Sequence, residues 1–260
     1  MPWTFDSPLA ICALAVLLSS GAYTLVAFRG RGREDSVLAS ALRPICTVYA
    51  RTIHRLRVLS DTRDPLPHEG AAILVANHRS GFDPLALAVA TRRKVRFLMA
   101  REYYGALGLG WVFRRFGCIP VNRDGNDLGA MKAALKALRD GEIIGIFPQG
   151  GIREAGSSLE GKAGVALLAL RSGVPVIPCY IEGSPNLESV ALAILKPSRT
   201  TLVYGPPVRF GSRDRKPERD ELERVTGAIF DSISRQRERL DTLAEEPEAD
   251  GMPPTAAKAL

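Results

Sequence analysis

The sequence predicts an α/β domain built around a largely parallel central sheet flanked by helices. Short apolar runs alternate with amphipathic segments of helical periodicity through the middle of the chain. Alternation of strand and helix in this way is typical of a parallel sheet whose connections are helical. At 260 residues the chain can bury one substantial core. We therefore expect a single domain with appendages at its ends.

Residues 8–28 form the first distinctive segment, which reads PLAICALAVLLSSGAYTLVAF and contains no charged side chain. Its length matches the roughly 20 residues that a membrane-spanning helix needs. The basic stretch RGRGR at 29–33 follows at once, and by the positive-inside rule this end stays cytoplasmic. A cleaved signal peptide would carry positive charge before the run, where Asp6 is the only charged side chain. We expect an uncleaved membrane anchor at 1–34, with a helix lying in one leaflet as the alternative.

Residues 35–60 are predicted to form a basic amphipathic helix. Apolar side chains recur at helical spacing with arginines between them, and Pro44 is expected to break or kink the first part. Next to a membrane anchor, such a helix is typical of a surface that rests on anionic lipid. An ordinary amphipathic helix packed on the domain has the same pattern.

The main domain is predicted at 61–240, after a turn-rich start at 61–70. Apolar runs predict strands at 71–76, 94–100, 117–123, 143–147, 174–181 and 200–204. Helical periodicity predicts helices at 84–90, 103–116, 127–139, 162–171 and 220–240. Pro, Glu and Ala dominate the end of the chain, so we expect a disordered tail at 241–260.

The composition narrows the classes of partner and site. Lys and Arg outnumber Asp and Glu by 35 to 28, giving a net charge of +7, which favours anionic partners such as acidic lipid headgroups, phosphorylated substrates or nucleic acid. The four cysteines are far apart and form no CxxC pair, so neither a zinc site nor a disulfide framework is indicated. The sequence also contains no Walker or dinucleotide fingerprint and no GxSxG elbow.

The segment NHRSGFD at 77–83 carries the main chemical signal. It follows the apolar run 71–76 and precedes Pro84, so we expect a strand-to-helix turn with Asp83 as the helix N-cap. On that turn Asp83 can reach one ring nitrogen of His78, fix its tautomer and leave the other nitrogen basic. A general base that takes a proton from an alcohol needs this arrangement. A capping aspartate and a surface histidine would give the same pattern.

A second candidate site lies at 148–153, PQGGIR, after the apolar run 143–147. The adjacent Gly150 and Gly151 let backbone N–H groups approach a ligand closely. Arg153 is able to clamp an oxyanion with two hydrogen bonds. Glycine pairs are common in turns, so these residues alone are a weak signal.

Four blocks in this order resemble the glycerolipid acyltransferases, and in particular the 1-acylglycerol-3-phosphate acyltransferases. The first resembles the family motif NHxSxxD and the third resembles FPEGTRS. The blocks are 77–83 (NHRSGFD), 117–123 (GCIPVNR), 147–153 (FPQGGIR) and 174–178 (VPVIP). The resemblance covers about residues 60–210, and it identifies 61–240 as an acyltransferase domain.

The resemblance implies a mechanism that agrees with the chemistry of the His/Asp turn. His78, oriented by Asp83, would deprotonate the free hydroxyl of lysophosphatidic acid. The oxygen would then attack the thioester of acyl-CoA or acyl carrier protein, with no covalent acyl-enzyme, metal or other cofactor, and no nucleic acid partner. The implied substrate-binding residues are Ser80, Arg123, Gln149, Gly150 and Arg153. The two arginines would hold the acceptor phosphate, and turn capping is the alternative role of Ser80.

Gln149 departs from the family pattern, which has glutamate at this position, and Gly151 stands in place of a threonine. Glutamine keeps a hydrogen-bond acceptor and adds a donor, but it lacks the negative charge. The same chemistry on a different lyso-lipid acceptor is therefore one alternative function. A non-catalytic, lipid-binding relative at the membrane is another.

Overall fold

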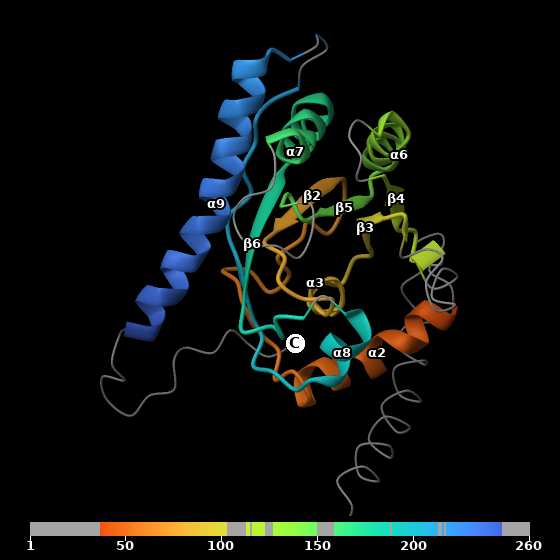
Figure 1. Cartoon of the computed structure of the whole chain (residues 1–260), viewed down its shortest axis with the longest axis vertical. Coiled ribbons are helices and arrows are strands. Elements are labelled where there is room, and N and C mark those ends of the chain that lie inside the picture. Colours follow the sequence, from red (N-terminus) through yellow and green to blue (C-terminus); the bar gives the residue numbers. More distant parts are fainter. Residues whose placement is uncertain are drawn as a thin grey trace, which may run out of the picture.

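The fold is taken from a computed structural model, drawn in Figure 1. The described residues are 37–102, 113–114, 116–122, 127–149, 159–187, 189–212, 215 and 217–245. The strands are β1 Arg57–Leu59, β2 Ala72–Ala76, β3 Val95–Ala100, β4 Ile119–Val121, β5 Ile143–Ile146, β6 Val176–Glu182 and β7 Thr201–Tyr204. The helices are α2 Val37–Thr52, α3 Asp83–Val89, α6 Leu128–Arg139, α7 Leu159–Ser172, α8 Val190–Leu195 and α9 Arg219–Glu245.

The strands of the described ranges form one sheet in the order β1-β7-β6-β2-β5-β3-β4. Neighbouring strands run parallel except β6 and β7, which are antiparallel. The prediction of an α/β domain with a largely parallel sheet is therefore confirmed. All five residues of β2 are buried, as a strand covered on both faces requires. The carboxyl end of β2, where the NHRSGFD segment begins, thus lies in the middle of the sheet.

Helices cover both faces of the sheet (Figure 1). On one face α6, α7 and α9 pack on Ile73 and Val75 of β2. On the other face α2, α3 and α8 pack on Leu74. Successive side chains of a strand point to opposite faces, so one short apolar run contributes to both cores.

Most predicted elements agree with the structure to within a few residues. The helix expected at 127–139 is α6. Its N-cap Asp127 accepts the Ala130 N–H at 2.9 Å, and Gly141 follows its end with φ +82°. A left-handed residue just past a helix is a common stop that favours glycine. Side-chain capping and the glycine stop therefore explain why the sequence located both ends of α6.

The helix expected over 35–60 is shorter in the structure. It ends at Thr52, Arg55 has φ +42°, and Arg57–Leu59 pair with β7 as β1. Pro44 lies inside α2, so it does not end the helix. Near the end of α2, Ala50 is fully buried and belongs to the core on the α3 side. This part of the helix is packed on the domain, which was the alternative reading of its amphipathic pattern.

Two further elements correct the predictions from sequence. The helix α8 was not expected. The last helix, α9, runs to Glu245, so the first residues of the predicted tail at 241–260 are helical.

Three predicted segments lie wholly or mostly outside the described residues: the membrane anchor at 1–34, most of the helix at 103–116, and residues 246–260 of the tail. Within the described ranges, no helix has both the length and the apolar character needed to cross a bilayer.

Candidate active site

The candidate site lies where β2 and β5 end. These strands are parallel neighbours, and ligands bind at the carboxyl ends of parallel strands in open α/β sheets. His78 follows β2, and Phe147 and Gln149 follow β5. The two segments are joined directly, because the backbone N–H of His78 donates to Oε1 of Gln149 at 3.1 Å.

His78 and Asp83 form a close pair. Nδ1 of His78 lies 3.0 Å from Oδ2 of Asp83. The Asp83 side chain is fully buried, whereas that of His78 is 15% exposed. A carboxylate only accepts hydrogen bonds, so Nδ1 donates to Oδ2, and in the neutral form of the imidazole Nε2 keeps its lone pair. No other described residue forms a hydrogen bond with Nε2, which leaves this nitrogen available as a base.

Backbone N–H groups fix the Asp83 carboxylate. Oδ2 also accepts the N–H groups of Arg79 and Ser80, both at 2.8 Å. Asp83 is the first residue of α3 rather than its N-cap, which is Phe82. The expected capping role is therefore corrected, because the carboxylate binds the preceding turn instead of the first turn of the helix. Three donors on one oxygen hold the carboxylate in place for His78.

Side-chain hydrogen bonds of Ser80 and Asn77 stabilise the turn. Ser80 is fully buried, and its hydroxyl accepts the Phe82 N–H at 3.2 Å. This contact is the capping role that the sequence left open for Ser80. The Asn77 side chain donates to the Ile181 carbonyl at 2.9 Å and accepts the Ile181 N–H at 2.7 Å. These two bonds tie the start of the turn to β6.

The turn at 77–83 is also contacted by segments that follow β6 in the chain. The Gly81 N–H donates to the Leu187 carbonyl at 3.3 Å. A Cβ atom at Gly81 would lie 2.6 Å from Cα of Val190, so only glycine fits this approach of α8. The ring of Phe82 is buried and stacks on His54, with centroids 3.7 Å apart. The turn at 77–83, which we call the catalytic turn for its candidate role, is therefore packed against α8 and the end of α2.

Aromatic rings set the orientation of His78. Its ring stacks on Phe147 with centroids 4.1 Å apart and an interplanar angle of 19°. Phe147 in turn stacks with Phe97 at 5.7 Å. A Cβ atom at Gly145 would lie 2.5 Å from the Phe97 ring, so this glycine makes room for the stack. Together with the bond to Asp83, the stack limits rotation of the imidazole.

The structure thus brings together four of the residues selected from sequence: His78, Asp83, Ser80 and Gln149. Arg123, Gly150 and Arg153 lie outside the described residues. Sequence reasoning missed the contributions of Asn77, Phe97 and His54. Asn77 stands inside the first block, so its position was a usable signal, whereas Phe97 and His54 lie in no motif. In the part of the chain that the structure describes, no group of three or more His, Cys, Asp or Glu side chains is placed to hold a metal ion.

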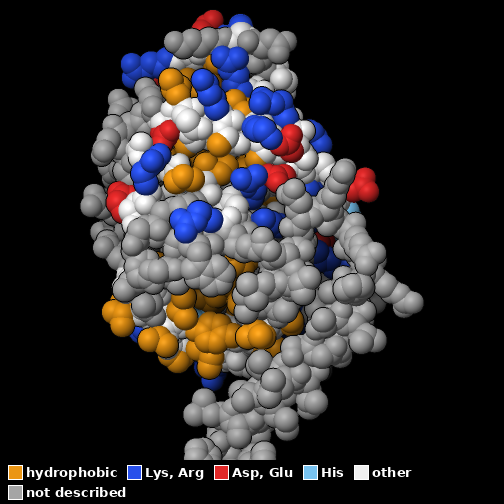
Figure 2. Space-filling model, turned by 90° about the vertical axis from the view of Figure 1, so that its right-hand side faces the viewer, with side chains coloured by type: hydrophobic (Ala, Val, Ile, Leu, Met, Phe, Trp, Pro, Cys, Tyr) orange, Lys and Arg blue, Asp and Glu red, His pale blue; other side chains and the backbone are white. Residues whose placement is uncertain are grey.

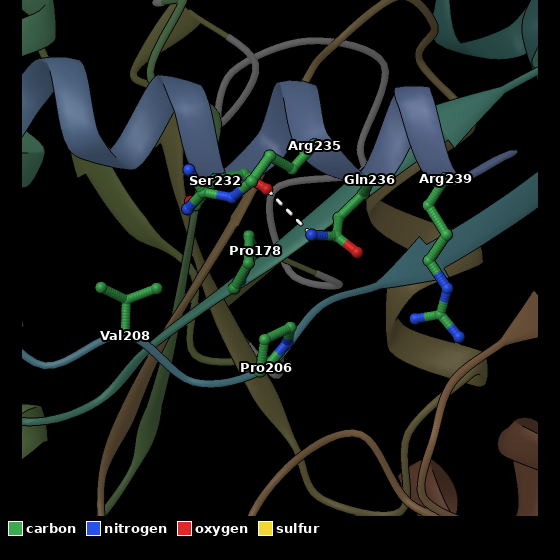
Figure 3. A pocket seen from close by; sticks show the side chains of 7 residues that line it. All are labelled: Pro178, Pro206, Val208, Ser232, Arg235, Gln236 and Arg239. Atoms are coloured by element: carbon green, nitrogen blue, oxygen red, sulfur yellow. Dashed lines mark hydrogen bonds between the residues drawn. The ribbon is translucent and has the colours of Figure 1, made fainter. Parts of the chain in front are cut away.

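A pocket of about 240 Å³ lies apart from this site, between α9 and the segment after β7 (Figure 3). Its wall is polar in part, and Nε2 of Gln236 donates to the Ser232 carbonyl at 3.1 Å within it. The lining residues are Pro178, Pro206, Val208, Ser232, Arg235, Gln236 and Arg239. None of the described site residues, His78, Ser80, Asp83 and Gln149, lines this pocket.

Comparison with known proteins agrees with the blocks. Residues 57–182 match the family described as Acyltransferase. The chain is 22% identical over 182 residues to the 1-acyl-sn-glycerol-3-phosphate acyltransferase of Bacillus subtilis, covering 70% of this chain and 88% of the relative. It is 29% identical over 177 residues to the enzyme of the same name from Streptococcus pneumoniae, covering 66% and 63%. A mouse relative, 1-acyl-sn-glycerol-3-phosphate acyltransferase alpha, is 25% identical over 202 residues, covering 76% and 68%.

A solved structure has the same fold. It is the crystal structure of the 1-acyl-sn-glycerophosphate (LPA) acyltransferase from Thermotoga maritima. The TM-score is 0.57 at 22% identity, and the match covers 88% of this chain and 92% of the other. The matched family and these relatives agree with the four sequence blocks. The chain is therefore similar to the acyltransferases, among them the 1-acyl-sn-glycerol-3-phosphate acyltransferases.

Proposed function

We propose that this chain transfers a fatty acyl group from an acyl thioester to the free hydroxyl of 1-acylglycerol-3-phosphate, giving phosphatidic acid. The observation that carries the proposal is the pair of His78 Nδ1 and Asp83 Oδ2 at 3.0 Å, with Nε2 available as a base. Relatives that bear the name of this reaction support the choice of acceptor. The proposed donor is acyl-CoA or acyl carrier protein.

The reaction proceeds by direct transfer. Nε2 of His78 takes the proton of the acceptor hydroxyl while the oxygen attacks the thioester carbonyl carbon. The tetrahedral intermediate collapses, the C–S bond breaks, and the imidazolium returns its proton to the departing thiolate. Asp83 keeps the proton on Nδ1 and stabilises the imidazolium, as the buried carboxylate of a catalytic triad does.

Binding of the acceptor phosphate is assigned to Arg123 and Arg153. Both stand in blocks that resemble the family, and a guanidinium group matches the geometry of a phosphate. Gln149 gives no separate reason to prefer another lyso-lipid. Its Oε1 accepts the backbone N–H of His78, which requires an acceptor oxygen but no negative charge.

The proposed location is the cytoplasmic face of a membrane, with the uncharged run 8–28 as the anchor. The basic residues at 29–33 support this orientation, and the lipid acceptor resides in the same membrane. Protease digestion of sealed vesicles checks the orientation. A protease added outside should cut the acyltransferase domain only in vesicles whose cytoplasmic face is on the outside.

The proposed function is tested by an acyl-transfer assay on membranes that contain the protein. Acyl-CoA and acyl carrier protein are offered in turn with lysophosphatidic acid and with lyso-lipids of other headgroups. We expect product with lysophosphatidic acid that is lost in His78→Ala while the circular dichroism spectrum is retained. Transfer only to another lyso-lipid would change the proposed acceptor but leave the proposed mechanism as it is. No transfer from either donor would favour a lipid-binding relative.

A further inference from the structure

We propose that α8 and the turn after α2 form a docking surface for a bilayer that contains anionic lipid. We call it the α8 surface. It consists of Ile53, Leu192 and Leu195, flanked by Arg55, Lys196 and Arg199. The proposal rests on the proposed function in one respect, because it assumes that the acceptor is presented by a membrane.

The centre of the α8 surface is apolar. The side chains of Leu192 and Leu195 are 57% and 74% exposed, and that of Ile53 is 37% exposed. Leu192 and Leu195 are three positions apart and therefore lie on one side of the helix. Ile53 belongs to the neighbouring segment, since its carbonyl accepts the Ser198 N–H at 3.3 Å. Single exposed leucines are ordinary, but these three residues lie on two segments that are hydrogen-bonded to each other.

The rim of the α8 surface is basic. Arg55, Lys196 and Arg199 are exposed. The charged side chains within 51–60 and 189–200 are Lys or Arg, while the acidic Asp61 and Glu188 directly adjoin these ranges and Asp61 pairs with Arg239. An apolar centre with cations around it and no acidic residue in the same segments complements anionic headgroups over an acyl interior. Each such cation is worth about fivefold in affinity for an anionic surface.

The α8 surface is joined to the catalytic turn. His54 stacks on Phe82, and the same imidazole bonds the Ile194 carbonyl at 3.0 Å and the Ser198 hydroxyl at 2.8 Å. The bond from Gly81 to Leu187 adds a second link. A bilayer in contact with the α8 surface would therefore hold the catalytic turn at a fixed place beside the headgroups.

The arrangement of the helices agrees with this placement. Figure 1 shows α8 beside α2 at the end of the molecule opposite α7. Figure 2 shows hydrophobic side chains gathered toward that end, with Lys and Arg more frequent toward the other end.

The test is fluorescence quenching in the full-length protein reconstituted into vesicles with brominated acyl chains. The Leu192→Trp variant reports on the α8 surface. The Leu128→Trp variant is the matched control, because Leu128 is a leucine of α6 that is 69% exposed. The signal of the parent protein, which contains Trp3 and Trp111, is subtracted. We expect quenching at least about twofold greater for Leu192→Trp than for Leu128→Trp, as bilayer contact requires.

The charge on the rim is tested in the same system. Adding Lys196→Gln and Arg199→Gln to Leu192→Trp should reduce quenching in vesicles with phosphatidylglycerol and change little in vesicles without it. The control pair Lys132→Gln and Arg139→Gln on α6 should have no such effect. Equal quenching at Leu192 and Leu128 would overturn the proposal. A blue-shifted but unquenched Leu192→Trp signal would also overturn it, because it would show a protein in contact with α8.

The quenching measurement and the acyl-transfer assay can each give a negative result without the other. Quenching needs no turnover, so an inactive protein can still show the α8 surface in the bilayer. Conversely, transfer to lysophosphatidic acid without quenching at Leu192 would keep the proposed function and remove the docking surface.

Discussion

One histidine, His78, lies on the catalytic turn and another, His54, packs against it, and their hydrogen-bond partners differ in the feature that matters for chemistry. His78 has a carboxylate on Nδ1 and an available Nε2. His54 is fully buried, and both of its ring nitrogens face neutral oxygens from Ser198, Ile194 and Tyr49. A general base needs a partner that orients one ring nitrogen and an open position at the other, and of these two histidines His78 has that arrangement. Neutral partners on both nitrogens make His54 a structural residue.

The largest expected effect comes from removing the imidazole of His78, the proposed general base. His78→Ala should reduce the rate of acyl transfer roughly 10³-fold, because no other described residue offers a base at this place. His54→Gln should keep most of the rate, since glutamine retains a donor and an acceptor. Initial rates of both variants at matched folded concentration check this difference. Similar losses in both would mean that His78 acts through the fold rather than on the substrate.

Asp83→Asn changes the partner of His78 while keeping its shape. The amide oxygen can still accept the N–H groups of Arg79, Ser80 and His78 Nδ1, but the negative charge that stabilises the imidazolium is lost. We expect a fall in the rate of roughly 10³-fold or more and a fold that still forms. The rate as a function of pH is the measurement. A variant with the full rate would show that Asp83 is needed only for the turn.

Much of the fold and the centre of the site could be predicted from sequence because they depend on local patterns. The buried strand β2 is a continuous apolar run, and His78 and Asp83 share one turn. β1 was missed because its three residues continue the periodicity of α2. α8 was missed because its six apolar residues are too few to show a helical period.

Contacts between distant segments could not be predicted in the same way. Gln149 lies 71 positions from His78 in the chain, and its block indicated a ligand site rather than a bond to the backbone of the first block. The pairing becomes visible only when β2 and β5 are placed side by side. The same holds for the stack of His54 on Phe82, since neither ring stands in a pattern that names the other.

Gln149 gives a smaller effect that sharpens the comparison. Gln149→Ala removes the oxygen that accepts the backbone N–H of His78. Because the turn then loses this hydrogen bond, the rate of acyl transfer should fall about tenfold. Gln149→Glu keeps the acceptor oxygen and should stay within a few-fold of the parent. The kcat and KM of the two variants for lysophosphatidic acid decide the point. If Gln149→Glu alone changed the preferred lyso-lipid, residue 149 would have to contact the acceptor.

Gly81 tests how closely α8 is packed on the turn that contains His78. Gly81→Ala would place Cβ 2.6 Å from the Val190 backbone, so α8 must shift, at a cost of about 1–3 kcal/mol in unfolding free energy. Gly227→Ala is the control, because a Cβ atom there meets nothing within 4 Å and the residue lies inside α9. Thermal unfolding should separate the two variants, with a lower midpoint for Gly81→Ala alone. Equal midpoints would mean that α8 moves freely relative to the turn.

The smallest expected effect is a pH dependence of stability that belongs to His54. Burial lowers the pKa of His54 below its ordinary value, and the hydrogen bond to the Ile194 carbonyl opposes this in part. In the unfolded chain the residue takes up a proton near pH 6.5, while in the folded chain it stays neutral to lower pH. The unfolded state then binds more protons, so stability falls as the pH drops below about 6.5. His54→Gln should flatten this part of the unfolding midpoint against pH, and an unchanged slope would assign the dependence to other groups.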